Sequence, residues 1–333
     1  MEQETLPLLH SNGRPASSVH RGTQCPVDFR TVASSIGITK RRRKQVESIC
    51  LIREQRATGR QELAFNARPF VLCGLPLRRP PSTQLIHRRR NGKFSLHVVA
   101  HPDFGLPFGQ GRLIPIWIAT LAVKQQSRTV HFASAIDMLR FFHFPTDGRY
   151  YARIIAGFKR IFAATIFFGT DEVSQAMPLF DWARFHFFDS ARLWFSRRES
   201  SSPEDSGHRP NAVTLSESFY AEISQHPIPA EREAVALLAN APGALDFYIW
   251  LAWKSWKLET ALARIPLFGT NGLASQLGCQ EYSSPRFFRR KLSAWLRRLT
   301  TIWSQCPAHI SEDGTYLLIK PSRKTPTGAR RPS

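Results

Sequence analysis

Residues 284–303 carry the clearest local pattern in the 333-residue chain. Ser284 followed by Pro285 is a typical helix start, because Ser caps free backbone N–H groups and Pro suits the first helical position. At about 100° per residue, one face of this helix is apolar and consists of Phe288, Leu292, Trp295, Leu296, Leu299, Ile302 and Trp303. The charged residues of this helix are all cations. Arg286, Arg290 and Arg297 lie on the opposite face, with Arg289 on one flank and Lys291 and Arg298 on the other. An ordinary solvated helix mixes signs, so this face favours an anionic partner over the alternative of a merely basic surface helix.

The segments on either side of this helix indicate a helix-turn-helix with a wing. Residues 271–277 read as a short helix that Gly278 ends. Downstream, Asp313 and Gly314 lie between two apolar runs, which is a strong signal for a β-hairpin. A short helix, a turn, a long basic helix and a hairpin describe a winged helix-turn-helix, whose second helix lies in the major groove of DNA.

A second segment repeats this plan. Residues 148–162 form a predicted helix whose apolar positions are Tyr151, Ile154, Ile155, Phe158, Ile161 and Phe162. Its other surface carries Arg149, Arg153, Lys159 and Arg160. An apolar helix over 113–125, a strand over 129–132 and a short helix over 134–144 precede it. Their counterparts in the second unit are residues 244–256, 264–267 and 271–277. The two segments share a pattern and not a sequence, and we read them as a duplicated unit.

The charge balance narrows the class of partner. Lys and Arg number 46 against 25 acids, a net charge of +21, which favours a polyanion such as DNA, RNA or an anionic membrane surface. The longest apolar run, residues 113–123, is well short of the ~20 residues that span a bilayer and contains Pro115. The N-terminus shows no signal-peptide pattern. We therefore expect a soluble, cytoplasmic protein with no membrane partner.

Catalytic and metal-binding patterns are missing from the sequence. The five cysteines are scattered without a C-x-x-C pair, and the eleven histidines never form His-x-His. A protein that cuts one DNA strand by the rolling-circle mechanism would need a His-x-His pair to hold a metal ion and a nucleophilic tyrosine. Tyr150 and Tyr151 are adjacent, but Tyr151 lies on the apolar face of its helix and reads as core. We expect no metal, no cofactor, no catalytic residue and no enzyme activity.

These patterns predict an α+β, mainly helical fold with two tandem winged helix-turn-helix domains and a disordered basic N-terminal extension. The extension covers residues 1–60, which lack an apolar period and contain the charge run 40–44. That run suggests a targeting patch, a nucleic-acid arm or an ordinary solvated segment. We assign the first domain to 61–200 and the second to 201–322, with a Ser/Pro-rich linker at 197–211 and a disordered basic tail at 323–333.

Several motifs together resemble a known family. They are GLPFGQGRLIPIWIATLAV, a Thr-Asp-Gly-Arg turn opening a basic helix, VTLSESFYAEISQHPIPAE, ALDFYIWLAW, RIPLFGTNGLASQLG and SPRFFRRKL. In order and spacing they are similar to the RepA-type plasmid replication initiators, over residues 61–321. The resemblance implies tandem winged helices that bind repeated sites (iterons) in double-stranded DNA at a plasmid origin. It also implies opening of AT-rich DNA, recruitment of host replication proteins, a homodimer through the first domain and repression of the protein's own promoter.

Two other functions remain open from the residues alone. A winged-helix transcriptional regulator without a replication role would use the same helices. An RNA-binding protein would prefer exposed aromatic side chains on a sheet. Here most aromatic residues recur at helical spacing, which favours a place in the core.

Overall fold

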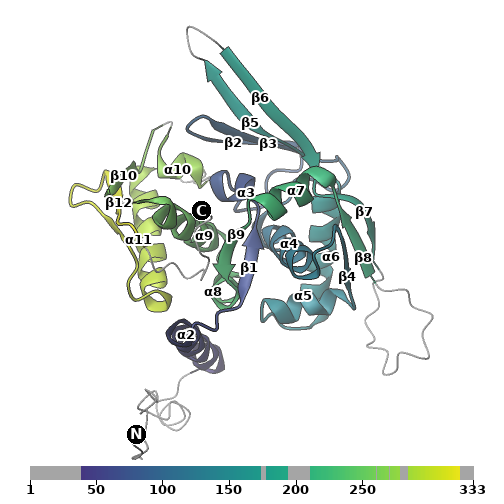
Figure 1. Ribbon diagram of the computed structural model, residues 1–333, viewed down its shortest axis with the longest axis horizontal. Coiled ribbons are helices and arrows are strands. Elements are labelled where there is room, and N and C mark those ends of the chain that lie inside the picture. The colour runs from purple at the N-terminus through teal and green to yellow at the C-terminus, as the bar shows by residue number, and fades with distance from the viewer. Residues whose placement is uncertain are drawn as a thin grey trace, which may run out of the picture. The chain divides into compact units, whose positions relative to one another are not determined.

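The computed structural model describes residues 39–173, 178–193, 211–259, 261–269, 271–277 and 284–322. The chain divides into two units, Met1–Lys44 and Gln45–Ser333, and the second unit contains the hydrophobic core. The fold is mixed, with more helix than strand among the described residues, which confirms the predicted mixture of α and β elements at this level (Figure 1). Within the described ranges, no helix is long and apolar enough to cross a membrane.

The first half of the core unit contains one helix–strand–helix–helix series. It consists of α4 (Leu113–Gln125), β4 (Thr129–Phe132), α5 (Ala135–Phe141) and α6 (Gly148–Phe162). Side chains set the starts of the last two helices. Ser134 and Asp137 form a capping box on α5, and Asp147 accepts hydrogen bonds from the Arg149 and Tyr150 N–H groups at the start of α6. Two strands, β7 (Phe188–Arg192) and β8 (Asn211–Leu215), complete a sheet of order β4-β8-β7.

The second half repeats this order of elements. It consists of α9 (Pro242–Lys257), β10 (Ala263–Pro266), α10 (Leu273–Gln276), α11 (Pro285–Ile302), β11 (Ala308–Ile310) and β12 (Tyr316–Ile319). Its sheet has the order β10-β12-β11, so in both halves the strand after the first helix pairs with the last strand of the series. The two sheets therefore have the same topology, although the sequences differ.

A separate antiparallel sheet lies in the first half and includes much of the aromatic-rich stretch 165–195, which the sequence suggests as wing strands and a connection. Its order is β2-β3-β5-β6, made of β2 (Ile86–Asn91), β3 (Phe94–Val99), β5 (Thr165–Val173) and β6 (Pro178–His186). β5 and β6 form one hairpin beside β3 (Figure 1). The strands that close the β4 sheet are instead β7 and β8, and of these two only β7 falls within residues 165–195.

The predicted domain boundary at residues 200 and 201 differs from the packing. β8 pairs with both β4 and β7, and α7 (Glu217–Gln225) packs against α4 and β6. Val213, Leu215 and Phe219 are fully buried, so residues 211–225 belong with the first half because its core covers their apolar side chains. The predicted linker 197–211 reaches into β8 at Asn211, and its remaining residues lie outside the described part of the chain.

Residues 229–239 read in the sequence as a helix with Pro229 at its start, but their first residues belong to the strand β9 (Ile228–Glu231). It pairs antiparallel with β1 (Leu63–Asn66), with Pro229 opposite Phe65. The helix α8 (Arg232–Leu238) begins only after this strand. A strand partner more than 160 residues away in the chain decides this local structure, and the apolar pattern alone did not contain it.

The expectation of disorder up to residue 60 is wrong for its last third, because α2 (Lys40–Thr58) is a helix. Ile52 on this helix is 1% exposed, Arg53 donates to the Thr301 carbonyl at 3.0 Å, and Arg56 pairs with Glu231 at 2.6 Å. Straight-chain Lys, Arg, Gln and Glu residues favour a helix, and these few contacts hold it although its apolar period is weak. Residues 1–38 and the predicted tail 323–333 lie outside the described residues.

Arg112 joins the two halves. It is 6% exposed and belongs to the short 3₁₀ helix η1 (Gly109–Arg112), which leads into α4. Its guanidinium pairs with Asp246 on α9 and donates to the carbonyls of Leu75 and Pro76 at 3.0 and 2.8 Å. Because this cation is satisfied from both halves, the two series of elements form one continuous packed unit.

Candidate nucleic-acid interface

The apolar face of α11 is buried as the sequence predicts. Phe288, Leu292, Leu299 and Ile302 are each 1% exposed or less, and Trp295 is 9% exposed. A Cβ atom at Gly243 of α9 would overlap the Trp295 ring, so the missing side chain lets the two helices approach closely. This packing fixes the rotation of α11 and turns its opposite face to solvent.

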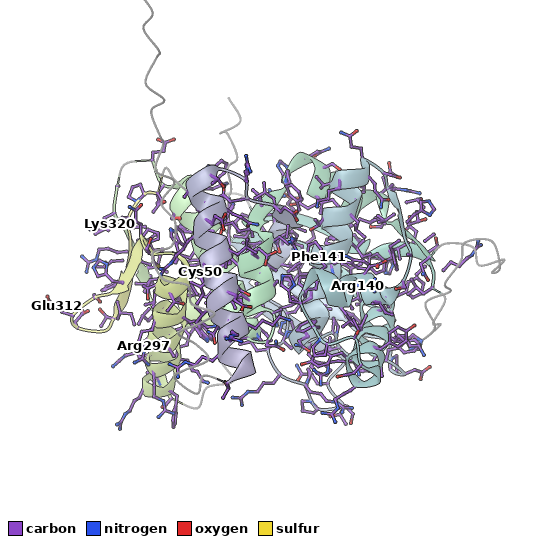
Figure 2. All side chains as sticks on the ribbon, turned by 90° about the horizontal axis from the view of Figure 1, so that it is seen from below. Cys50, Arg140, Phe141, Arg297, Glu312 and Lys320 are labelled. Atoms are coloured by element: carbon purple, nitrogen blue, oxygen red, sulfur yellow. The ribbon has the colours of Figure 1, made fainter. Side chains whose placement is uncertain are left out.

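Five exposed cations lie outside the buried stripe, three on the opposite face and two, Arg289 and Lys291, on its flanks. Arg286, Arg289, Arg290, Lys291 and Arg297 are all exposed, and Figure 2 labels Arg297 on α11. The Arg289 guanidinium lies over the Phe268 ring at 5.4 Å, and that of Arg290 lies over the Phe287 ring at 5.0 Å. A guanidinium over an aromatic face is held in place without losing its charge. The side chains of Arg289 and Arg290 are thus held in place and still available to an anion.

Arg298, the sixth predicted contact on this helix, has a different environment. It is half-buried, and its guanidinium donates to the Leu237 carbonyl of α8 at 2.9 Å. This hydrogen bond ties α11 to α8, so we assign Arg298 to packing. The sequence could not reveal this, because α8 reaches the helix only through the tertiary fold.

The hairpin β11–β12 lies against α11, with Glu312 in its turn (Figure 2). Gly314 has φ +67°, the left-handed conformation that this turn requires. Hydrogen bonds from Ser311 and Thr315 lower the pKa of Asp313 to about 2. The turn is therefore negatively charged at neutral pH, which makes it a poor contact for phosphate groups.

The second predicted basic face lies on α6. Arg149, Arg153 and Lys159 are exposed, and Arg153 donates to the Gln110 side chain at 3.0 Å. Arg160 is half-buried and donates to the Phe104 carbonyl at 3.1 Å. Burial and the neighbouring Arg79 lower the pKa of Arg160. Three of the four predicted contacts are thus accessible, while Arg160 mainly anchors the loop before η1.

The rejected nucleophile candidates have ordinary structural surroundings. Tyr151 is 7% exposed and belongs to the core, and the neighbouring Tyr150 stacks on Phe144 with the ring centroids 5.1 Å apart. In the described part of the chain, no group of three or more His, Cys, Asp or Glu residues could hold a metal ion.

One further basic cluster was missed in the sequence. Arg88, Arg89 and Arg90 lie on β2, and this strand packs beside α10. Three consecutive arginines before the Asn91-Gly92 turn are a visible signal. Their place next to the helix that precedes α11 depends on the fold.

The two halves of the core unit have sheets of the same topology, and each half carries a helix with exposed cations on its surface. These features suit a protein that contacts an anionic polymer. Residues 180–265 match the RepA_C family model, described as "Plasmid encoded RepA protein". The resemblance to the RepA-type plasmid replication initiator family is therefore confirmed over these residues.

Other comparisons add less. No curated protein matches the chain by sequence. Two crystal structures, both of domains 2 and 3 of RctB, have 15% and 14% sequence identity to it, with TM-scores of 0.46 and 0.45. Each alignment covers 74% of this chain, and 94% or 95% of the RctB chain. These TM-scores are too low to support a conclusion, so the resemblance to the family rests on the match over residues 180–265.

Proposed function

We propose that this protein initiates plasmid replication by binding repeated sites in double-stranded origin DNA. The series α9 to β12 and α4 to β8 act as two winged helix-turn-helix units, with α11 and α6 as the helices that enter the major groove. The protein works in the cytoplasm without a cofactor. The match of residues 180–265 to RepA proteins supports the role in replication.

The observation that carries the proposal is the single-signed exposed face of α11. Its 18 residues span about 27 Å, and its five exposed cations lie on the face opposite the buried Phe288, Leu292, Leu299 and Ile302 or on the flanks of that face. An α-helix fits the major groove, where Arg side chains pair with guanine edges and phosphates. The short helix α10 before it and the hairpin after it correspond to the positioning helix and the wing.

The protein opens DNA by binding and not by cutting. Deforming or unstacking a duplex costs a few kcal/mol, which contacts from two units can supply. Strand cleavage would need an activated nucleophile, and Tyr151 is buried in the core. Homodimerisation, contacts with host replication proteins and repression of its own promoter complete the proposal.

The first experiment measures specific DNA binding. Arg286→Ala with Arg290→Ala should weaken binding to the repeats beside the gene by about 1–3 kcal/mol for each base-reading side chain removed. A matched control removes two exposed cations elsewhere, Arg60 and Lys124, and should change specific affinity little. Fluorescence anisotropy at fixed salt compares the two double variants. Unchanged specific binding without both α11 arginines would remove this helix from the interface.

The second experiment separates initiation from plain transcriptional regulation and from cutting. Wild-type protein on supercoiled origin DNA with magnesium should leave the plasmid unnicked, while permanganate detects unpaired thymines near the sites. A regulator without a replication role would bind without opening the DNA. Site-specific nicking, or a covalent adduct at Tyr150 or Tyr151, would contradict the binding mechanism.

A further inference from the structure

One face of the sheet β2-β3-β5-β6 carries arginine or histidine side chains in three consecutive cross-strand rows. The strand register aligns Arg90, Ser95, Gly169 and Trp182 in the first row, Arg88, His97, Phe167 and Arg184 in the second, and Ile86, Val99, Thr165 and His186 in the third. These rows contain three arginines, two histidines and no carboxylate. The opposite face carries buried Leu96, Val98 and Ile166, so the basic face is the one turned away from the core.

This face borders a hollow of about 560 Å³ between the sheet and the second half of the chain. Arg88, Arg89, Arg90, Ser95 and His97 line it from the sheet, and Gly269 and Ser275 line it from the second half. Ser275 belongs to α10, which packs beside β2 (Figure 1). Arg88 and Arg90 are exposed, and the Arg90 Nε donates to the Gly92 carbonyl at 3.0 Å, which fixes its guanidinium beside the turn.

One cation of α11 lies close in the chain fold to this hollow. Arg289 of that helix lies over the Phe268 ring, and the next residue, Gly269, lines the hollow. Phe268 and Gly269 therefore connect the surroundings of Arg289 to the hollow that Arg88 and Arg90 line. An anionic polymer that contacts α11 and extends past Phe268 comes next to these arginines.

The chemistry of the hollow fits the phosphate backbone better than unpaired bases. Single-strand binding proteins stack bases on free aromatic faces. Here a Cβ atom at Gly169 would lie 2.7 Å from Trp182 Cγ, so the indole covers the glycine. Its ring also contacts His97, with centroids 5.0 Å apart. Trp182 is thus half-buried against the sheet, and the described residues that line the hollow include no Phe, Tyr or Trp, whereas their guanidinium groups, with paired N–H donors, suit phosphate oxygens.

We propose that Arg88 and Arg90 form a phosphate-binding site for duplex DNA that adjoins the α11 interface. The contact is independent of base sequence and sets the register of the duplex on α11. It rests on the proposed DNA binding for the identity of its partner, and it adds β2 and the hollow to the interface.

The test is the salt dependence of binding. Each phosphate contact contributes a slope of ~0.9 in the plot of log K against log salt, so Arg88→Ala with Arg90→Ala should reduce the slope by about 2. Affinity should fall by the same factor on the repeats and on a random duplex, because phosphates carry no sequence information. Arg88→Lys with Arg90→Lys should largely restore the slope. The Arg60→Ala, Lys124→Ala double variant serves as the control, and thermal melting verifies folding of each protein.

The random duplex separates this proposal from the proposed function. If the repeats are not bound specifically but the slope on random duplex still falls, the phosphate site stands and the origin-binding role fails. An unchanged slope on both duplexes would refute the phosphate site while leaving the α11 contacts in place. Loss of binding to a single-stranded oligonucleotide, with both duplexes unaffected, would also refute it, since the site would then hold unpaired DNA.

Discussion

Asp246 and Arg112 form the ion pair that joins the two halves of the chain, and removing the carboxylate should destabilise the whole core unit. Asp246→Ala leaves the Arg112 guanidinium buried beside the Leu75 and Pro76 carbonyls, without the negative charge that balances it. Removing one partner of a buried pair costs about 3–5 kcal/mol. Since whole domains are stable by about 5–15 kcal/mol, this is a large fraction of the total.

Urea unfolding followed by circular dichroism measures the change. Asp246→Asn keeps an acceptor for Arg112 but removes the charge, and it should lose less stability than Asp246→Ala. Asp181→Ala removes an exposed carboxylate from β6 and should change stability by less than about 0.5 kcal/mol. If Asp246→Ala lowered the free energy of unfolding as little as this control does, the Arg112–Asp246 ion pair would not be what joins the two halves.

Three further predictions concern pH, the second basic helix and salt. Burial, with a smaller contribution from Arg89, lowers the pKa of His87 from 6.5 to about 4, so the folded protein favours the neutral imidazole. The contribution of His87 to the free energy of unfolding is therefore complete above pH 6.5. It is lost as pH falls toward 4, by at most about 3 kcal/mol, and His87→Gln, which can still donate to Gly74, should flatten this dependence in melting curves. Arg149→Ala with Arg153→Ala should weaken binding to repeats and random duplex more evenly than the α11 variant, as anisotropy can show; unchanged binding would remove α6 from the interface. For the wild type, log K should fall by ~0.9 per neutralised phosphate against log salt, and a nearly flat profile would exclude a mainly electrostatic interface.

The sequence by itself determined the elements whose signals are local. The helix α6 has the predicted bounds, and α11 begins at Pro285 and ends one residue before Trp303. Apolar residues at i, i+3, i+4 and i+7 must share a face of any helix, and a capping residue acts within one turn. The hairpin around Gly314 follows for the same reason, because turn residues need only their immediate neighbours.

Only the tertiary structure decided which distant segments meet. β8 pairs with β4 across 79 to 85 residues, β9 pairs with β1, and α2 is held by Glu231 and the end of α11. Strand partners are chosen by packing and register, which a single strand does not encode. The same cause separates the two kinds of arginine on α11: Arg297 faces solvent, whereas Arg298 meets a carbonyl of α8. Helical periodicity assigned each residue to a side of its helix, and the fold determined what lies on that side.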